Sequence, residues 1–424
     1  MSFSYAAVYQ AKAVCLTPLR TGGADGDAEQ VLRRKDGTAF VQGTSLAGAM
    51  LDWLKGQPER SHADDLFGSQ EQAGHLTVSD VLFDCEANQL TRPRLRIDPV
   101  SATGDGSGKF DVAHMGTGSK LSFTLVWQGN TEDRQELDIV EKLLGAVNAG
   151  DICLGAQKSN GFGRLSLFVR RRLFNLKNAA DRRAWLADDW MGEVILLPAA
   201  ENSGRVKFAV TGRIGSILIK DAPAAKVEGD EGRRSYIPNL SENGKAVLPG
   251  SSVKGAVRAR AAYIAKMLGL DKGKIEQYFG RPAKDGDNGL PGLVRFEDVV
   301  LSGHKRKISR IRIDRFTGGV QRQGLFTEEP ISSAVALTIT APEEPVLCAL
   351  LVYALRDLGL GLYHLGSGWA IGRGKVEVEE IHAATPDGRQ AALRFDSQGN
   401  ITQEDSEGLL KGWLNKLEEE VRHG

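Results

Sequence analysis

The chain has 424 residues, which is enough for two or three domains with substantial cores. Hydrophobic residues make up 41% of the chain and charged residues 25%, as is ordinary for a globular protein. The 54 Lys and Arg residues balance the 54 Asp and Glu residues. The net charge therefore gives no indication of a polyanionic partner, and any nucleic-acid binding has to depend on local clusters of cations.

Several kinds of segment are missing from the sequence. The four cysteines show no Cys-x-x-Cys or Cys/His spacing, which argues against a zinc site, and cysteines this sparse suit a reducing cytosol. The N-terminus lacks a basic region followed by a long apolar run, so we expect no signal peptide. No run of about 18 apolar residues occurs, so we expect no membrane span. These features together predict a cytoplasmic protein.

Strands and helices alternate through the first half of the chain. Val8, Ala11 and Ala13 indicate a first strand by their spacing. Leu46 and Met50 recur at helical spacing after a Gly-Thr-Ser turn. We expect strands at 5–19, 39–41, 76–83, 120–127 and 165–169, helices at 46–54 and 136–147, and polar or Gly-rich loops at 21–27, 100–119 and 153–164.

The second half repeats this plan roughly 210 residues later. Five landmarks recur in the same order: a turn that starts a helix, a Phe-Gly loop, a strand, an Arg-x-Arg-Ile-Asp segment and a Gly-rich turn. They lie at 41–50 and 249–258, 66–68 and 278–280, 76–83 and 293–301, 94–99 and 310–315, and 155–164 and 366–375. This constancy of order and spacing indicates a tandem duplication.

Each half has the order strand, helix, strand, hairpin, strand, helix, strand. That order predicts an α+β fold with a ferredoxin-like sheet and its helices on one face. Residues 176–204 are interpreted as a connector. Residues 386–424 are a polar stretch followed by an amphipathic helix with Leu409, Trp413 and Leu417 on one face, which we expect to pack on its own domain.

The helix start of the second half is a candidate anion site. Ser251 or Ser252 can cap the first turn, and Lys254 and Arg258, four residues apart, lie side by side. Backbone amides at a helix N-terminus together with paired cations suit a phosphate, although ordinary capping explains the Gly-Ser-Ser sequence equally well. In the first half, Thr44 and Ser45 are followed by Ala47 and Leu51 in place of the two cations. The two helix starts are therefore expected to bind anions unequally.

Two further groups of residues are candidates for nucleic-acid contact. The segment 303–315 is the most basic run, and Arg310 and Arg312 alternate with isoleucines in a way that predicts a strand with one cationic side; the alternative is a solvated face. The Gly-rich turns allow close backbone approach to a partner, or form tight hairpins. Their candidate residues are Lys158, Gly161, Gly163 and Arg164 in the first half and Gly372 and Arg373 in the second.

The ordered set of motifs, present twice, resembles the RAMP superfamily of CRISPR systems, and most closely the backbone subunits of type III effector complexes. The resemblance covers residues 5–172 and 206–382. It implies two tandem ferredoxin-like, RRM-like RAMP domains with loop and thumb insertions: a first domain at 1–175, the connector, a second domain at 205–385 and the C-terminal segment. It places the thumbs near 100–115 and 316–326.

The resemblance implies guide RNA (crRNA), target RNA and other type III subunits as partners, with no membrane. The residues that it and the motifs assign to RNA binding are Thr44, Ser45, Lys158, Gly161, Gly163, Arg164, Ser251, Ser252, Lys254, Arg258, Arg260, Arg310, Arg312, Gly372 and Arg373.

Type III backbones cleave target RNA with an Asp in the loop before the helix start, and Asp27 occupies that position. In the second half the matching position is Arg234, and the nearest acid is Asp230. Both aspartates are taken as catalytic candidates, although an Asp in such a loop is usually a turn former. A carboxylate at this place can hold Mg²⁺ beside the phosphodiester, or act as a base on the 2′-hydroxyl.

Two alternative functions stay open. One is a catalytically inactive, structural crRNA-binding subunit, which the balanced charge and the unmatched second aspartate allow. The other is a stand-alone endonuclease that processes pre-crRNA. Enzymes of that kind often depend on histidine, and His114 and His364 are isolated histidines in the sequence, so we interpret them as structural.

Overall fold

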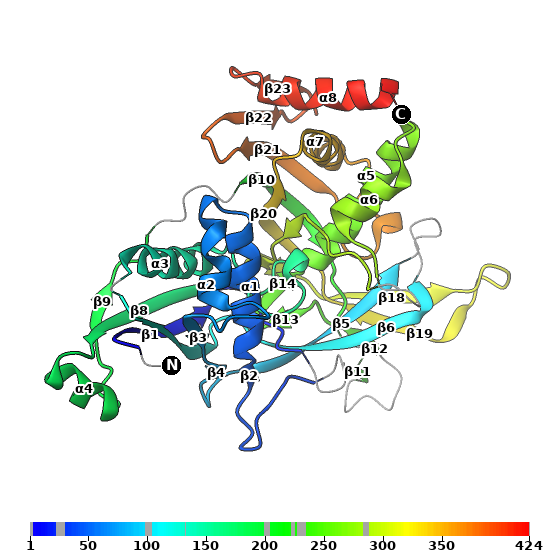
Figure 1. Cartoon of the computed structure of the whole chain (residues 1–424). Helices are drawn as coiled ribbons and strands as arrows, with labels where there is room; N and C mark the ends of the chain where they lie inside the picture. Colours follow the sequence, from blue (N-terminus) through cyan, green and yellow to red (C-terminus); the bar gives the residue numbers. More distant parts are fainter. Residues whose placement is uncertain are drawn as a thin grey trace. The chain divides into compact units, whose positions relative to one another are not determined.

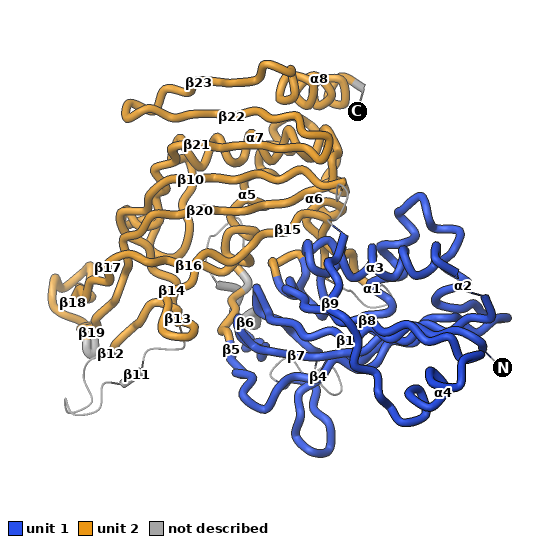
Figure 2. Tube along the Cα trace, turned by 90° about the vertical axis from the view of Figure 1, so that its left-hand side faces the viewer, with its two compact units in different colours: residues 1–91, 110–158, 162–203 blue, residues 92–109, 159–161, 204–424 orange. Residues whose placement is uncertain are grey.

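The structure is a computed structural model, and it describes residues 3–22, 30–97, 104–131, 133–198, 204–221, 225–226, 235–282 and 288–423. The chain divides into two compact units (Figure 2). Unit 1 comprises Met1–Thr91, Phe110–Lys158 and Phe162–Ser203, and unit 2 comprises Arg92–Lys109, Ser159–Gly161 and Gly204–Gly424. Two short segments of the first repeat therefore fold as part of unit 2.

Unit 1 is built on an antiparallel sheet with the strand order β2-β4-β7-β1-β8-β9, in which β3 also pairs with β7. Its elements are β1 (Tyr5–Cys15), β2 (Phe40–Val41), α1 (Gly43–Lys55), η2 (Pro58–His62), α2 (Ala63–Phe67), β3 (Leu76–Val78), β4 (Val81–Phe83), β7 (Lys120–Gly129), α3 (Arg134–Ala149), η3 (Lys158–Asn160), β8 (Leu165–Asn175), α4 (Ala179–Leu186) and β9 (Glu193–Ile195). β5 (Gln89–Ile97) and β6 (Gly104–Met115) pair with each other.

Alternate side chains of β1 point to opposite faces of this sheet, and different helices pack on the two faces. Tyr9 and its alternate neighbours share one buried cluster with Leu46 and Met50 of α1 and Leu143 of α3, so these helices lie on the same face (Figure 1). Val8 points to the other face, where Trp185 of α4 packs. The expected connector thus contributes α4 to the second face, and β9 extends the sheet beside β8.

Unit 2 repeats the arrangement with the strand order β15-β20-β10-β21-β22-β23, and β17 also pairs with β20. The elements are β10 (Arg205–Ile217), β11 (Ala225–Lys226), β12 (Ser235–Ile237), β13 (Ser241–Glu242), β14 (Lys245–Leu248), α5 (Gly250–Met267), α6 (Lys272–Phe279), β15 (Arg295–Phe296), β16 (Val299–Leu301), β17 (His304–Lys305), β18 (Ile308–Ile313), β19 (Val320–Glu328), β20 (Ile331–Pro342), α7 (Pro345–Gly359), η4 (Trp369–Ile371), β21 (Val376–Ala384), β22 (Gln390–Phe395), β23 (Ile401–Glu404) and α8 (Leu409–His423).

The central strands of both sheets follow the ferredoxin-like order. In unit 1 the fourth, first and third strands of the repeat are β8, β1 and β7, and β3 and β4 pair with β7 in the place of the second strand. In unit 2 they are β21, β10 and β20, and β15 pairs with β20 in the place of the second strand. The predicted α+β fold is therefore confirmed in both repeats. In unit 2 a separate four-stranded sheet, β11-β12-β19-β18, includes the hairpin that the sequence predicted as a thumb.

The C-terminal segment completes unit 2. β22 and β23 extend the main sheet, so the polar stretch after residue 386 contains two strands. α8 packs through Leu409, Trp413 and Leu417 into the same core as α7. Packing of this helix on its own domain, as the sequence predicted, is confirmed. None of the helices within the described ranges is long and apolar enough to cross a membrane.

The predicted serine caps are wrong, because an aspartate from the link between two strands binds each helix N-terminus. The N-cap of α5 is Pro249 and makes no side-chain hydrogen bond. Instead, the Gly250 backbone N–H donates to Oδ1 of Asp298 over 2.7 Å, and the Gly43 N–H of α1 donates to Oδ1 of Asp80 over 3.0 Å. Residues from links between strands, outside the helix, thus satisfy an N–H that the helix leaves unpaired.

Glycine is needed at both of these helix starts. A Cβ on Gly250 would lie 2.1 Å from the carbonyl oxygen of Phe296, and one on Gly43 would lie 2.4 Å from that of Val78. The close approach of the helix to the strand is what brings the aspartate within hydrogen-bonding distance.

The two capping aspartates differ in their surroundings. Asp80 pairs with Arg34 at 2.7 Å on the surface, and this hydrogen bond, with that from Gly43, lowers the Asp80 pKa. Asp298 pairs at 2.6 Å with Arg92, which is 2% exposed and also binds Glu242. Burial alone would lower the pKa of Arg92, but the hydrogen bonds and charges of Glu242 and Asp298 raise it, so this buried guanidinium stays charged.

Replacing the two capping aspartates should therefore have unequal effects. Asp298→Ala removes a helix cap and also leaves Arg92 with one carboxylate, so we expect a loss of about 3–5 kcal/mol in the free energy of unfolding of unit 2. Asp80→Ala removes the matching cap at the surface, and about 1 kcal/mol should be lost from unit 1. Urea denaturation of the two variants measures the difference, and equal losses would contradict the importance of the buried triad.

Candidate nucleic-acid interface

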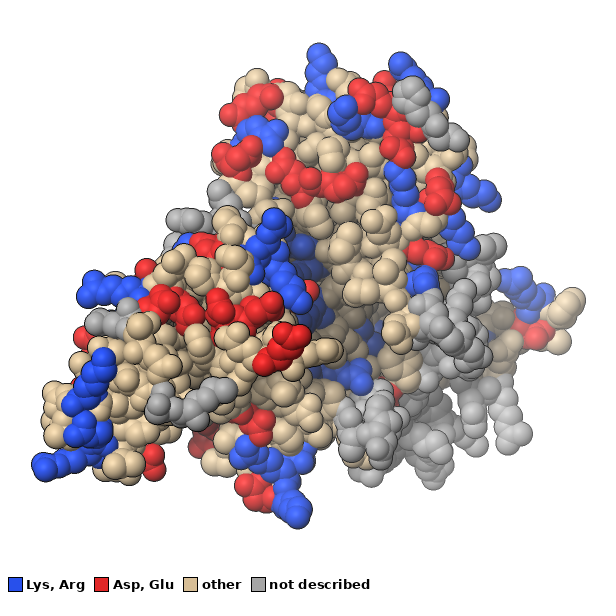
Figure 3. Space-filling view, viewed as in Figure 1, with Lys and Arg blue, Asp and Glu red and all other residues tan. Residues whose placement is uncertain are grey.

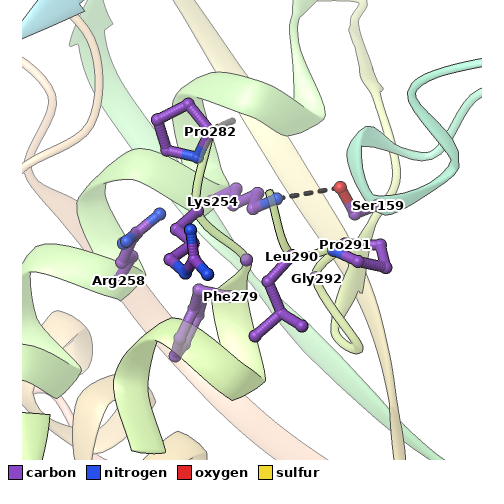
Figure 4. A pocket seen from close by; sticks show the side chains of 10 residues that line it. Ser159, Lys254, Arg258, Phe279, Pro282, Leu290, Pro291 and Gly292 are labelled. Carbon is purple, nitrogen blue, oxygen red and sulfur yellow. Dashed lines mark hydrogen bonds between the residues drawn. The ribbon is translucent and has the colours of Figure 1, made fainter. Parts of the chain in front are cut away.

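A pocket of about 250 Å³ lies beside the first turns of α5, within unit 2 (Figure 4). Ser159, Lys254, Arg258 and Arg281 bring polar groups to it, and Phe279, Gly280, Pro282, Leu290, Pro291 and Gly292 complete the lining. The apolar and backbone parts restrict the space, and the polar side chains decide what it can bind.

The cations of this pocket come from two elements. Lys254 and Arg258 are four residues apart on α5 and therefore share a face. The Lys254 ammonium donates to Oγ of Ser159 over 2.8 Å (Figure 4). Arg281, which follows α6, lies with its Nε 3.7 Å from Oε2 of Glu276. Within the described part of the chain, neither Lys254 nor Arg258 forms an ion pair with a carboxylate.

Burial disfavours the charged forms of Lys254 and Arg258. The pKa of Lys254 is lowered to about 8, first by burial and then by the charges of Arg258 and Arg94. Burial also lowers the pKa of Arg258, although the charge of Glu276 opposes the shift. A bound anion would relieve this repulsion and restore the full charge of Lys254. The pocket is thus suited to a phosphate or another small anionic group.

The position of this site differs from what the sequence predicted. We expected an anion on the backbone amides of the helix N-terminus, but Asp298 already occupies the Gly250 N–H. The two cations begin one turn further along α5. Ser251 and Ser252 are half-buried in the first turn and cap nothing.

The first repeat lacks the two cations at its helix start. Thr44 and Ser45 are exposed in the first turn of α1, and Ala47 stands where α5 has Lys254. The start of α1 presents hydroxyl groups without charge, as the sequence indicated.

Three of the predicted RNA-binding arginines bind buried carboxylates. Arg373 is 6% exposed and lies 2.8 Å from Glu328, which Arg310 approaches at 3.4 Å. Arg260 lies 2.7 Å from Asp357. Glu328 and Asp357 are themselves buried, and a buried carboxylate requires such a partner. These arginines therefore neutralise the buried carboxylates of Glu328 and Asp357 in unit 2.

The Gly-rich turns are mostly tight turns. A Cβ on Gly163 would lie 2.0 Å from the carbonyl oxygen of Leu154, and one on Gly161 would lie 2.4 Å from that of Phe296. Gly372, in contrast, is exposed, and nothing lies within 4 Å of the place of its Cβ. Backbone approach by a partner is sterically open at Gly372.

The other residues predicted to contact RNA are Lys158, Arg164 and Arg312, and their exposure differs. Lys158 is half-buried in η3, and Arg164 packs beside Gly150. Arg312 is exposed on β18, with its guanidinium 5.3 Å from the ring centre of Phe326. Over the face drawn in Figure 3, Lys and Arg side chains are interspersed with Asp and Glu, in agreement with the balanced composition.

The two catalytic candidates, Asp27 and Asp230, lie outside the described residues. Within the described ranges one group of side chains has the geometry to hold a metal ion, formed by His62, Asp65 and Glu136 of unit 1. The sequence analysis missed both this group and the capping aspartates. The latter were detectable, because Asp80 and Asp298 occupy matching places before Val81 and Val299 in the repeated strand.

Two separate stretches of the chain, residues 12–166 and 219–377, match the sequence model of the RAMP superfamily. The chain belongs to the RAMP superfamily. The two matched stretches correspond to the two repeats, so the predicted pair of tandem RAMP domains is confirmed. No curated protein sequence matches the chain significantly.

The chain also resembles solved structures, among them one described as "Cryo-EM structure of the Type III-B Cmr-beta bound to cognate target RNA". The likeness has a TM-score of 0.33 at 12% identity and covers 40% of this RAMP protein and 61% of that chain, less than two thirds of its length. At this level the likeness assigns neither a partner nor an activity to the protein.

The titration of Lys254 predicts how the binding of an anion in this pocket depends on pH, with a short single-stranded RNA as the probe. The ammonium loses its proton around its pKa of about 8, so the affinity for a short single-stranded RNA should be constant only below about pH 7. The affinity should fall by up to about tenfold between pH 7 and pH 9. Affinities are measured at constant ionic strength, with Lys254→Arg as the control, because an arginine keeps its charge and should remove the decline. A flat wild-type profile would contradict this role of Lys254.

Proposed function

We propose that this protein is a backbone subunit of a type III CRISPR effector complex, which binds guide RNA and cleaves complementary target RNA in the cytoplasm. The observation that carries the proposal is the half-buried cation pair of Lys254 and Arg258 in the second of two RAMP domains. The pair lacks carboxylate partners within the described ranges and lines a pocket of a size suited to a phosphate group.

The guide would be held through its backbone. A phosphate beside α5 gains the charges of Lys254 and Arg258, which distinguish no base. Arg312 on β18 and the open backbone at Gly372 offer further contacts in unit 2. In the first repeat, Thr44 and Ser45 offer hydroxyl groups only. Recognition of the target then comes from base pairing with the guide.

Cleavage is assigned to Asp27, and less directly to Asp230, from their places in the sequence before the helix starts. Mg²⁺ bound at such a carboxylate would stabilise the charge that develops on the phosphoryl oxygens. The carboxylate of Asp27 would either hold the ion or accept the proton of the attacking 2′-hydroxyl.

A structural, non-cleaving crRNA-binding subunit is the second candidate, since Arg234 stands where the second repeat would need its aspartate. The processing endonuclease gains no support from the histidines. His114 is fully buried against Phe162, and Nδ1 of His364 lies 2.9 Å from the backbone oxygen of Arg373.

Guide binding is tested by removing the two cations. Lys254→Ala and Arg258→Ala should each weaken guide binding for all sequences alike and reduce the slope of log K against log[salt] by about 1. Lys266→Ala removes an exposed cation from the last turn of the same helix and serves as the control. Affinity is measured across a salt series, and equal behaviour of all three variants would contradict the proposed phosphate contact.

Cleavage is tested in the assembled complex with Asp27→Ala. Guide binding should be unchanged, whereas cutting of the target should fall by about 10²–10⁴-fold. Asp25→Asn alters a neighbouring carboxylate of the same loop and should cut at the wild-type rate. If every cut persists at full rate in Asp27→Ala and in Asp230→Ala, the structural, non-cleaving function is supported instead.

A further inference from the structure

Three metal-ligating side chains meet in unit 1, away from the start of α1. One ligand atom from each of His62, Asp65 and Glu136 lies within 4.8 Å of the others. His62 ends η2, Asp65 belongs to α2, and Glu136 lies in the first turn of α3. Three helical segments, η2, α2 and α3, thus contribute to one cluster.

Helical spacing and backbone hydrogen bonds hold His62 and Asp65 in place within the cluster. His62 and Asp65 are three residues apart across the junction of η2 and α2, so their side chains share one face. The His75 backbone N–H donates to the carbonyl oxygen of Asp65 over 2.8 Å, and Gln128 N–H donates to that of His75 over 2.9 Å. Backbone hydrogen bonds therefore connect α2, through His75, to β7 of the sheet.

Glu136 is prepared as a ligand by its own partners. It is 4% exposed, and its carboxylate accepts a hydrogen bond from Trp127 Nε1 and lies 3.0 Å from Nδ1 of His75. Such outer hydrogen bonds orient a metal-binding carboxylate. His62 and Asp65 are half-buried, which leaves a path from solvent to the cluster.

The second repeat provides a comparison within the same chain. Counted from the shared Phe-Gly loop, Lys274 replaces His62 and Gln277 replaces Asp65. Lys274 forms an ion pair with Glu420 of α8. At this place the second repeat therefore has the positively charged side chain of Lys274. The first repeat instead brings two carboxylates and an imidazole together, and a metal ion bound there would relieve the repulsion between the carboxylates.

We propose that His62, Asp65 and Glu136 bind one divalent transition-metal ion of the Zn²⁺ class, which fastens α2 to α3. An imidazole nitrogen with two carboxylate oxygens suits Zn²⁺, with a water as the fourth ligand, better than Mg²⁺, which prefers oxygen ligands throughout. His75 acts as a positioning residue for Glu136. This site is separate from the proposed RNA cleavage and requires neither guide nor target.

The test uses the full chain after treatment with a chelator. Addition of Zn²⁺ should give one bound ion per chain by elemental analysis and raise the unfolding temperature by several degrees, whereas Mg²⁺ at the same concentration should do neither. His62→Gln and Asp65→Asn should lose the ion and the thermal shift. Asp64→Asn makes the same charge change at the exposed neighbouring residue and should retain both.

Substitution with Co²⁺ identifies the ligands independently of folding. A site made of imidazole and carboxylates should show visible d–d bands without the strong ultraviolet band of a cysteine thiolate. A thiolate band, binding by Asp65→Asn equal to that of Asp64→Asn, or no bound Zn²⁺ in the wild type at micromolar concentration would each overturn the proposal.

Discussion

The carboxylate of Asp298 joins three parts of unit 2. One oxygen accepts the first N–H of α5 at Gly250, and the other binds the buried guanidinium of Arg92. Arg92 is carried by β5 of the first repeat, so the folding of unit 2 requires a segment from the other half of the chain. A buried arginine with two carboxylate partners is stable only when all three groups are in place. This triad holds the first residue of α5 in place. The positions of Lys254 and Arg258 follow, because both belong to the same rigid helix.

The same carboxylate decides where an anion can bind. Because Asp298 neutralises the N-terminus of α5, the backbone amide at Gly250 is no longer open to a phosphate. The positive charge that lacks a carboxylate partner within the described ranges lies on Lys254 and Arg258, in a pocket whose burial lowers the pKa of both. Repulsion between them makes the empty pocket unfavourable and an occupied one favourable, which is the electrostatic basis of the proposed guide contact.

The two repeats have kept one fold and diverged in their charged groups. Both retain the ferredoxin-like strand order and an aspartate at the helix start, at Asp80 and Asp298. The second repeat has cations at the helix start and Lys274 near the Phe-Gly loop, whereas the first has neutral residues at the helix start and His62 in the place of Lys274. The proposed phosphate contact of Lys254 and Arg258 and the proposed metal site therefore lie in different units of one chain.

The sequence by itself determined the duplication, the α+β class, the two helix starts and the docking of α8, because apolar periodicity and repeated motifs are local properties of the chain. It could not determine the partner of each charged side chain. The serines at the start of α5 resemble caps, yet Asp298, from the link between β15 and β16, takes that role. Arg373 resembles an RNA contact, yet Glu328 holds it in the interior. Similarly, His62 and Asp65 are neighbours in sequence, but Glu136 joins them only through the packing of α3. Tertiary structure decided these pairings, since a charge interacts with the groups that folding brings within a few ångströms of it, whatever their separation along the chain.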